Sequence, residues 1–242
     1  MKLLIADNYT ALSQQAAADL IKLAGNEKAP LVCPATGDTP AGLYKVLVDK
    51  VNNKEVDISC WHFLGLDEWV GMNGEDEGSC RFHLNNQLLF PLQVASDNII
   101  FFDGRANNLQ EECSKTEAFI RQQGTIDISV LGLGMNGHIG MNEPGTAIDT
   151  RSHVGELDAE TQKVGQKYFN TAQRLTAGIT LGLGTLMESK HILLLISGAH
   201  KAAIVKKALE GAISEKVPGS LLRNHPSLRI YLDKEAAQLL AF

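Results

Sequence analysis

Residues 126–144 read IDISVLGLGMNGHIGMNEP, and this stretch decides both the fold and the place of the site. Its first six residues are mostly apolar, which is typical of a strand buried on both faces of a parallel sheet. Four glycines follow within residues 132–140, and glycine lets a backbone take positive φ angles or pass close to a ligand. Because ligands of open α/β sheets bind at the carboxyl ends of strands, we expect a site in this loop, around His138 and Glu143.

Strand-like and helix-like patterns alternate along the whole chain, which is typical of an α/β fold. Apolar residues recur at helical spacing over residues 9–24, and Gly25 ends that predicted helix. The predicted strands are residues 30–35, 61–66, 98–102, 126–131, 192–196 and 228–232. No internal repeat or interdomain linker interrupts the pattern. We therefore predict a single doubly wound, Rossmann-like α/β domain over residues 1–242, with a mostly parallel sheet flanked by helices.

The composition, 44% hydrophobic and 21% charged residues, is that of an ordinary globular protein. A net charge of −6 argues against nucleic-acid binding, which needs a basic surface to replace counterions. The four cysteines are scattered without zinc-site spacing, no apolar run reaches membrane-spanning length, and the N-terminus lacks a signal-peptide pattern. We expect a cytoplasmic protein with no nucleic-acid or membrane partner; whether it is a monomer or a homo-oligomer stays open.

The first predicted strand-to-helix junction carries Thr36, Gly37, Asp38 and Thr39. Hydroxyls, a glycine and a helix N-terminus together form a cradle for an anion, because free N–H groups and the helix dipole favour negative charge. The alternative is a plain helix cap made by one of the polar side chains. Both interpretations remain open on this motif alone.

The second junction ends the predicted strand 61–66 with Asp67 and Glu68. Burial beside an aromatic residue raises the proton affinity of a carboxylate, so that it can act as a base. Side chains alternate along a strand, so the two carboxylates point to opposite faces, and we favour Asp67 as the working group. The alternative is a solvated acid in a turn.

The third junction is the glycine-rich loop, where His138 is suited to proton transfer near neutral pH and Glu143 can orient it. Asp67, His138 and Glu143 offer three metal ligands, but no HxH or HExxH pattern supports a metal site, and we expect neither a metal nor a cofactor. Lys167 and Lys201 are placed where either can pair with a phosphate; the alternative for each is an ordinary surface lysine.

Together these junctions resemble the glucosamine-6-phosphate deaminase and 6-phosphogluconolactonase superfamily. The motifs that carry the resemblance span nearly the whole chain in order: ATGDTP (35–40), LDEWV (66–70), LGLGMNGHIGMNEPG (131–145), GITLGLGTLM (178–187), ISGAHKA (196–202) and NHP (224–226). The resemblance implies a doubly wound α/β fold. In its deaminase branch it implies conversion of an aminosugar 6-phosphate into a ketose 6-phosphate and ammonia, without a metal or organic cofactor.

By this resemblance, Asp67 moves a proton between C2 and C1 of the open-chain sugar. His138 helps to open the pyranose ring by proton transfer at the ring oxygen, and Glu143 supports it. Asn136 belongs to the same catalytic group, because an amide can orient the imidazole.

The resemblance also implies the residues that hold the substrate. Residues 36–39 and Lys201 bind its phosphate, Lys167 falls where deaminases place a phosphate-binding arginine, and Gly137 contacts the sugar. The acidic segment 71–78 and residues 150–173 are candidates for a mobile cover over the site.

Three positions depart from the glucosamine-6-phosphate deaminase pattern. Asn136 replaces an aspartate, which removes a charge that would stabilise the imidazolium form of His138. His153 stands where deaminases have an arginine, and Lys167 lacks the two-pronged phosphate geometry of arginine. These departures resemble galactosamine-6-phosphate isomerases.

We therefore expect conversion of galactosamine 6-phosphate into tagatose 6-phosphate and ammonia. The alternative is glucosamine-6-phosphate deaminase, which gives fructose 6-phosphate and ammonia. A 6-phosphogluconolactonase is disfavoured by the pair Asp67 and Glu68. A non-enzymatic sugar-phosphate sensor is disfavoured because such regulators carry a helix-turn-helix segment and need no acid–base groups.

Overall fold

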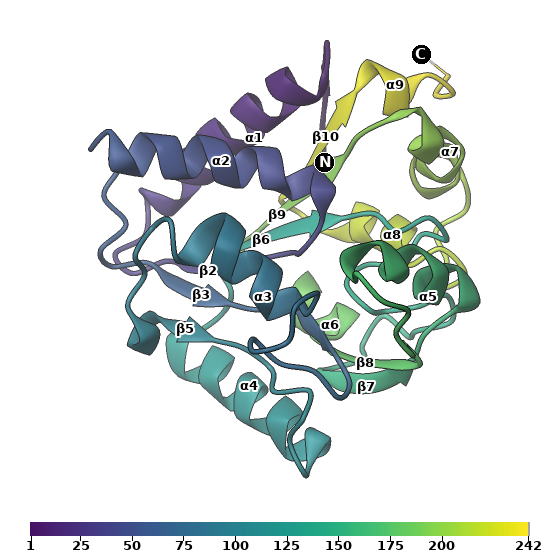
Figure 1. Ribbon diagram of the computed structural model, residues 1–242. Coiled ribbons are helices and arrows are strands. Elements are labelled where there is room, and N and C mark those ends of the chain that lie inside the picture. The colour runs from purple at the N-terminus through teal and green to yellow at the C-terminus, as the bar shows by residue number, and fades with distance from the viewer. Residues whose placement is uncertain (242) are drawn as a thin grey trace.

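A seven-stranded parallel sheet forms the centre of the computed structural model, which describes residues 1–241 (Figure 1). Its strand order is β1-β10-β9-β6-β2-β3-β5, and every neighbouring pair runs parallel. The strands are β1 (Lys2–Ala6), β2 (Leu31–Pro34), β3 (His62–Leu64), β5 (Ile99–Ile100), β6 (Ile128–Gly132), β9 (His191–Ile196) and β10 (Leu228–Asp233). All six predicted strands are confirmed, and β1 is a seventh at the edge of the sheet.

Helices cover both faces of this sheet, as the prediction of a doubly wound fold requires. The α-helices are α1 (Tyr9–Ala24), α2 (Asp38–Asn52), α3 (Cys80–Leu84), α4 (Leu109–Gln123), α5 (Ala159–Gly165), α6 (Leu183–Met187), α7 (Ala202–Glu210), α8 (Pro218–Leu221) and α9 (Lys234–Ala237). Shorter helical turns are η1 (Asn85–Leu89), η2 (Ser96–Asn98), η3 (Gln166–Tyr168), η4 (Ala199–Lys201) and η5 (Leu222–Asn224). In Figure 1, α1 and α2 lie on one side of β2 and β3, and α4 lies on the other.

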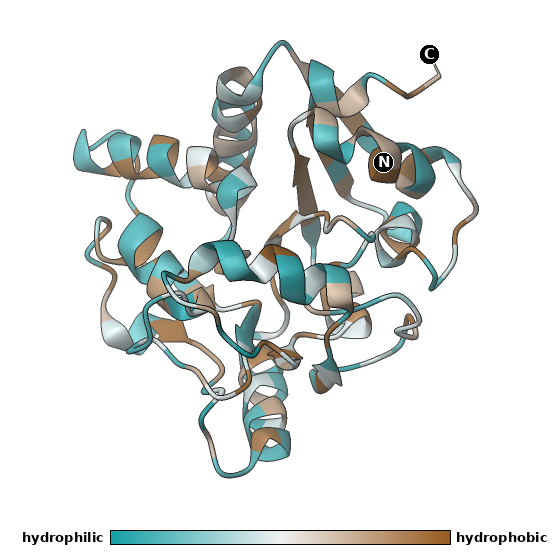
Figure 2. Ribbon diagram, turned by 45° about the vertical axis from the view of Figure 1, so that its right-hand side comes forward, coloured by the Kyte–Doolittle hydropathy of each residue, from teal (hydrophilic) through white to brown (hydrophobic). Residues whose placement is uncertain are grey.

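The side chains of the central strands alternate between two hydrophobic cores. In β9, Ile192 and Leu194 face the core formed with α4, α6 and α7, whereas Leu193 and Leu195 face the core formed with α1 and α2. Continuous apolar strands of this kind are expected where both faces of a parallel sheet are buried. Figure 2 shows the apolar strands in the interior and hydrophilic residues on the outer turns of the helices.

A second, three-stranded antiparallel sheet corrects one prediction. It has the order β4-β8-β7, with β4 (Asp67–Trp69), β8 (Ala177–Thr180) and β7 (His153–Glu156). The predicted strand 61–66 therefore ends at Leu64, and Asp67 begins a strand of its own. Gly65 makes the break possible, because a Cβ there would lie 2.1 Å from the ring of Phe101.

The direction in which successive strands are added to the sheet changes between β2 and β6. From β2 it proceeds outward through β3 to β5, and from β6 it proceeds through β9 to β10 on the other side. Ligands of open α/β sheets bind at such a switch point, outside the carboxyl ends of the strands. The loops that follow β2 and β6 are the two that carry the predicted anion cradle and the glycine-rich histidine motif. No helix within residues 1–241 is long and apolar enough to cross a membrane.

Candidate active site

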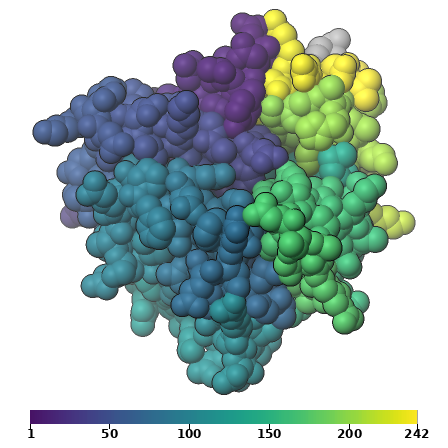
Figure 3. All heavy atoms as spheres, viewed as in Figure 1, coloured from purple at the N-terminus to yellow at the C-terminus, as the bar shows by residue number. Residues whose placement is uncertain are grey.

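A cavity of about 400 Å³ lies at the carboxyl ends of β2, β6 and β9, next to β4. Residues 36–39, Asp67, His138, Lys167 and Lys201 all contribute to its wall. Segments that are far apart in the sequence therefore meet here, as the sequence motifs predicted. On the face shown in Figure 3, residues around α5 (green) abut the surfaces of α2 and α3 (blue to teal). This segment forms one side of the cavity through Glu160, Thr161 and Val164.

One end of the cavity has the geometry that was predicted for an anion cradle. Gly37 takes a φ of 144°, and α2 begins directly after it without a side-chain cap. The first N–H groups of α2 are therefore free of side-chain partners and carry the positive end of the helix dipole. This geometry favours the anion cradle over a plain helix cap. The hydroxyl of Thr36 instead donates to the carbonyl of Cys80, 3.2 Å away.

Two lysines reach the same end of the cavity, but they differ in burial and in their hydrogen-bond partners. Lys201 is half-buried and donates to the carbonyl of Leu133 at 2.5 Å; burial, together with the charge of Lys167, lowers its pKa to about 8. Lys167 is more exposed and pairs with the carboxylate of Asp38 at 2.6 Å. Lys167 is therefore already paired with a carboxylate, whereas Lys201 has no carboxylate partner within residues 1–241.

Asp67 lines the cavity and is only 7% exposed. Burial raises its pKa from 3.8 to about 7; a hydrogen bond from the thiol of Cys80 lowers it, and the charge of Glu68 raises it. A carboxylate with this pKa can both take up and release a proton near neutral pH. The alternative of a solvated turn acid is wrong for this residue.

Glu68 points away from the cavity, as strand alternation predicted. Its carboxylate accepts backbone N–H groups from Trp69 and Cys80 at 2.9 Å and from Arg81 at 3.0 Å. It thereby fixes the start of α3 beside β4. Glu68 holds the framework around Asp67 and does not line the cavity.

His138 is held by a chain of hydrogen bonds that begins at Glu143. The Nδ2 of Asn136 donates to Oε2 of Glu143 at 2.7 Å, and the Oδ1 of Asn136 lies 2.8 Å from Nδ1 of His138. A carboxylate only accepts, so the amide must turn its oxygen toward the imidazole, and Nδ1 carries the proton. Nε2 then keeps its lone pair. The hydroxyl of Thr161 lies 3.0 Å from Nδ1 as a further partner.

The electrostatics of this group keep the imidazole neutral. Burial lowers the pKa of His138 and outweighs the carboxylate of Glu143, whose Oε2 is 3.7 Å from Nδ1. Asn136 and Glu143 lie behind His138 and do not line the cavity. They can act on a substrate only through the imidazole.

Gly137 does not line the cavity either, although it was predicted to contact the sugar. It takes a φ of 92°, and its carbonyl accepts the N–H of Gly219 at 2.8 Å. A Cβ at this position would approach Val217 to 2.8 Å. The glycine is therefore needed to shape the loop and to pack it against α8.

Several residues on the cavity wall were not predicted from the sequence. They are Cys80, whose thiol meets Asp67, Thr161, and the aromatic side chains of Trp69, His83 and Tyr168. Apart from Trp69, which lies in the motif LDEWV, none belongs to a motif that was recognised in the sequence. Their positions depend on how α3 and α5 pack beside β4. Within residues 1–241, no group of three or more His, Cys, Asp or Glu side chains is arranged to hold a metal ion.

The fold and the cavity define a class of protein: a doubly wound α/β protein with an uncapped helix N-terminus, a buried carboxylate and a hydrogen-bonded histidine at the switch point of its sheet. The chain belongs to the family described as glucosamine-6-phosphate isomerases/6-phosphogluconolactonase, whose model matches residues 6–230.

Similar proteins cover the whole chain. It is 37% identical to a glucosamine-6-phosphate deaminase of Thermoanaerobacter pseudethanolicus over 99% of the chain and 95% of that protein. It is 39% identical to one of Clostridium tetani, over 99% of the chain and 100% of that protein. The solved structure of a monomeric glucosamine-6-phosphate deaminase superposes with a TM-score of 0.96 at 35% identity, covering 99% of this chain and 100% of the other.

A 6-phosphogluconolactonase from Trypanosoma brucei shares the fold, with a TM-score of 0.78 at 20% identity, covering 99% of this chain and 98% of the other.

Proposed function

We propose that this protein converts an aminosugar 6-phosphate and water into a ketose 6-phosphate and ammonia. The observation that carries the proposal is the position of Asp67. This buried carboxylate, with a pKa of about 7, lies in one cavity with a neutral histidine and with an anion cradle. Moving a proton between adjacent carbons needs such a base, and opening the sugar ring needs a second proton-transfer group.

In this proposal each end of the cavity has its own role. The N-terminus of α2 and Lys201 bind the phosphate, which positions the rest of the small sugar. Nε2 of His138 takes the proton of the C1 hydroxyl and delivers it to the ring oxygen, so that the C1–O5 bond breaks and the open-chain aldehyde forms. Asp67 then removes the proton from C2 and delivers it to C1. As the amine at C2 becomes an imine, a proton passes from its nitrogen to the former aldehyde oxygen. Water then adds to C2, and the C2–N bond breaks to give the ketose and ammonia.

We infer that the substrate is glucosamine 6-phosphate. The names of the most similar proteins support this alternative better than the galactosamine substrate expected from the sequence. Galactosamine 6-phosphate remains the second candidate because of Asn136 and His153. Asn136 is hydrogen-bonded to His138, which lines the cavity, whereas His153 does not line the cavity.

A direct comparison of the two epimers tests this choice. We expect initial rates of ammonia release, measured over a range of concentrations of each sugar, to give a higher kcat/KM for glucosamine 6-phosphate. A clear preference for galactosamine 6-phosphate would return the assignment to the second candidate. Sugar-phosphate binding without turnover would instead support a sensor.

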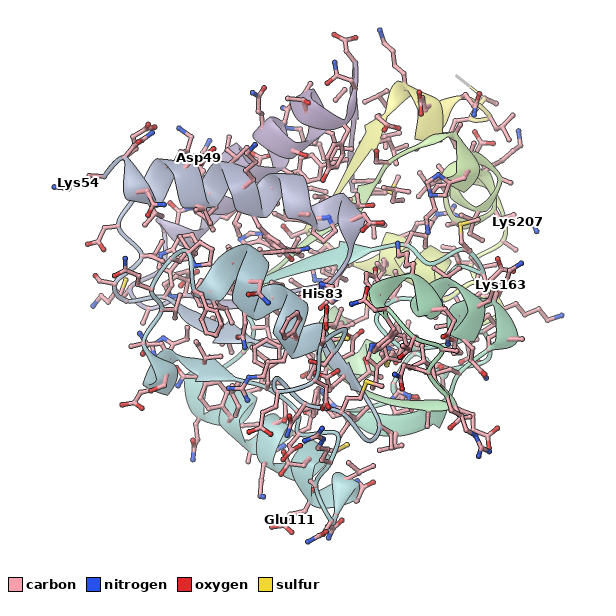
Figure 4. All side chains as sticks on the ribbon, viewed as in Figure 1. Asp49, Lys54, His83, Glu111, Lys163 and Lys207 are labelled. Carbon is pink, nitrogen blue, oxygen red and sulfur yellow. The ribbon has the colours of Figure 1, made fainter. Side chains whose placement is uncertain are left out.

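Lys201→Met should raise KM by about 10–100-fold, because one hydrogen bond between charged groups is lost from the phosphate site. The effect on kcat should be smaller, since Lys201 does not touch the carbons that react. Steady-state kinetics and inhibition by inorganic phosphate measure the change. Lys207→Met is the matched control, because Lys207 lies on α7 and points into solvent at the edge of the molecule (Figure 4). Equal KM values for both variants would exclude Lys201 from the phosphate site.

Cys80→Ala should shift the acidic limb of the pH profile of kcat/KM to higher pH. The thiol of Cys80 donates to Asp67 and lowers the pKa of that carboxyl, so its loss raises the pKa further. Asp67 must be ionised to take the C2 proton, and the active fraction therefore appears at higher pH. Cys60→Ala, at an exposed position, is the control. An unshifted profile in Cys80→Ala would show that another group sets the acidic limb.

A further inference from the structure

Tyr9 lines the cavity beside the N-terminus of α2, although it lies outside every motif recognised in the sequence. It is the first residue of α1, which follows the carboxyl end of β1, and the side chain of Asn8 caps that helix by accepting the N–H of Ala11 at 3.0 Å. α1 and α2 pack against each other (Figure 1). The side chain of Tyr9 is half-buried, and its hydroxyl reaches the first turn of α2.

The hydroxyl of Tyr9 is bound on two sides by the backbone of α2. It donates to the carbonyl of Asp38 at 2.7 Å and accepts the N–H of Gly42 at 2.7 Å. A carbonyl only accepts and an N–H only donates, so the direction of both hydrogen bonds is fixed. The single proton of the hydroxyl is therefore used. The hydroxyl can act on a bound phosphate only through the helix.

Glycine at position 42 makes this contact possible. A Cβ there would lie 2.7 Å from Oη of Tyr9 and would collide with Oγ of Ser13, another residue of α1. A larger residue would therefore displace the phenol from α2. Glycine in the middle of a helix is destabilising relative to alanine. The close approach of Tyr9 and Ser13 to α2 accounts for its presence here.

The hydrogen bond to Asp38 fixes the orientation of one peptide group of the anion cradle. The carbonyl of Asp38 and the N–H of Thr39 belong to the same planar trans peptide, so they point in opposite directions. Tyr9 holds the carbonyl, and it thereby also fixes the direction of the N–H. Thr39 lines the cavity in the first turn of α2, where neither the helix nor a side-chain cap supplies a partner for this N–H. A hydrogen bond at the carbonyl also polarises the peptide and strengthens its N–H as a donor.

We propose that Tyr9 is a positioning residue of the phosphate site, because its hydroxyl holds the peptide between Asp38 and Thr39 so that the N–H of Thr39 can bind the phosphate. The inference rests on the proposed function, in which the N-terminus of α2 binds the phosphate of the sugar. A donor that is already oriented binds an anion more tightly, because it need not be ordered when the anion arrives. The hydroxyl of Tyr9 takes no part in proton transfer. Its loss should therefore weaken binding and leave the chemical steps largely unchanged.

Titration calorimetry with inorganic phosphate tests this role without turnover. Tyr9→Phe removes the hydroxyl and keeps the ring. It should raise the Kd of inorganic phosphate by about three- to tenfold, as expected for one hydrogen bond. KM for the aminosugar phosphate should rise by the same factor, with kcat unchanged. Tyr231→Phe is the matched control, because the hydroxyl of Tyr231 also bonds to α1, at Asp19 over 2.6 Å, but Tyr231 does not line the cavity. Its Kd should equal that of the wild type.

The amide of Thr39 gives a second readout, which a general loss of stability does not change. In isotope-labelled protein, saturating inorganic phosphate should shift the amide proton resonance of Thr39 downfield. The shift should be smaller in Tyr9→Phe than in the wild type and in Tyr231→Phe. Either an unchanged Kd or an unchanged Thr39 shift in Tyr9→Phe would overturn the positioning role. Absence of ammonia release from either aminosugar phosphate by the wild-type enzyme would overturn the proposed function instead, whatever the calorimetry shows.

Discussion

Asp67→Asn should lower the rate of ammonia release by about 10²–10⁴-fold, the usual contribution of one proton-transfer group. The amide cannot take the C2 proton, but it has the same shape and needs no charge in its buried position. Binding of inorganic phosphate should therefore stay within about twofold of wild type, because the N-terminus of α2 and Lys201 are untouched. Asp49→Asn is the control, since Asp49 is an exposed residue of α2 (Figure 4).

The same variant has an expected effect on stability. The pKa of Asp67 is raised from 3.8 to about 7 in the folded protein, so the native state holds this proton more tightly than the unfolded chain. In the wild type this group therefore lowers the free energy of unfolding as the pH rises from about 4 to 7. Asp67→Asn removes that contribution. Chemical denaturation at pH 5 and pH 8 should show a smaller loss of stability in the variant. An inactive variant that is also unfolded would leave the proton-transfer role without support.

His138→Gln should slow turnover of the closed pyranose by about 10²–10⁴-fold. The relay from Glu143 through Asn136 keeps the proton on Nδ1, and it leaves Nε2 to exchange a proton with the ring oxygen. A glutamine amide can satisfy Asn136 but cannot exchange a proton near neutral pH. Stopped-flow kinetics with the ring-closed sugar measure the change. Turnover at the wild-type rate would show that His138 is structural.

The large sheet was predictable because its central strands are short runs of apolar residues that can be recognised in the sequence. The apolar runs of β6, β9 and β10 are buried on both faces, so sequence composition alone locates them. The loop after β6 was predictable for a related reason, since its glycines permit the φ angles that the turn requires. Asp67 could be preferred over Glu68 because neighbouring side chains of a strand point to opposite faces of the sheet.

The small sheet and much of the cavity wall were not predictable. β7 and β8 are short, and β4 is only three residues long, so their pairing depends on contacts distant in the sequence. The hydrogen bond from Cys80 to Asp67 arises because Glu68 fixes the start of α3. Likewise, the pair of Lys167 and Asp38 joins residues that are 129 positions apart. No local pattern encodes such contacts.

The central claim is the conversion of an aminosugar 6-phosphate into a ketose 6-phosphate and ammonia. The most direct test is to quantify both products from the purified protein with glucosamine 6-phosphate. We predict that ammonia and fructose 6-phosphate form in equal amounts and that Asp67→Asn forms neither at an appreciable rate. Hydrolysis of 6-phosphogluconolactone, with no ammonia from either aminosugar phosphate, would contradict the account.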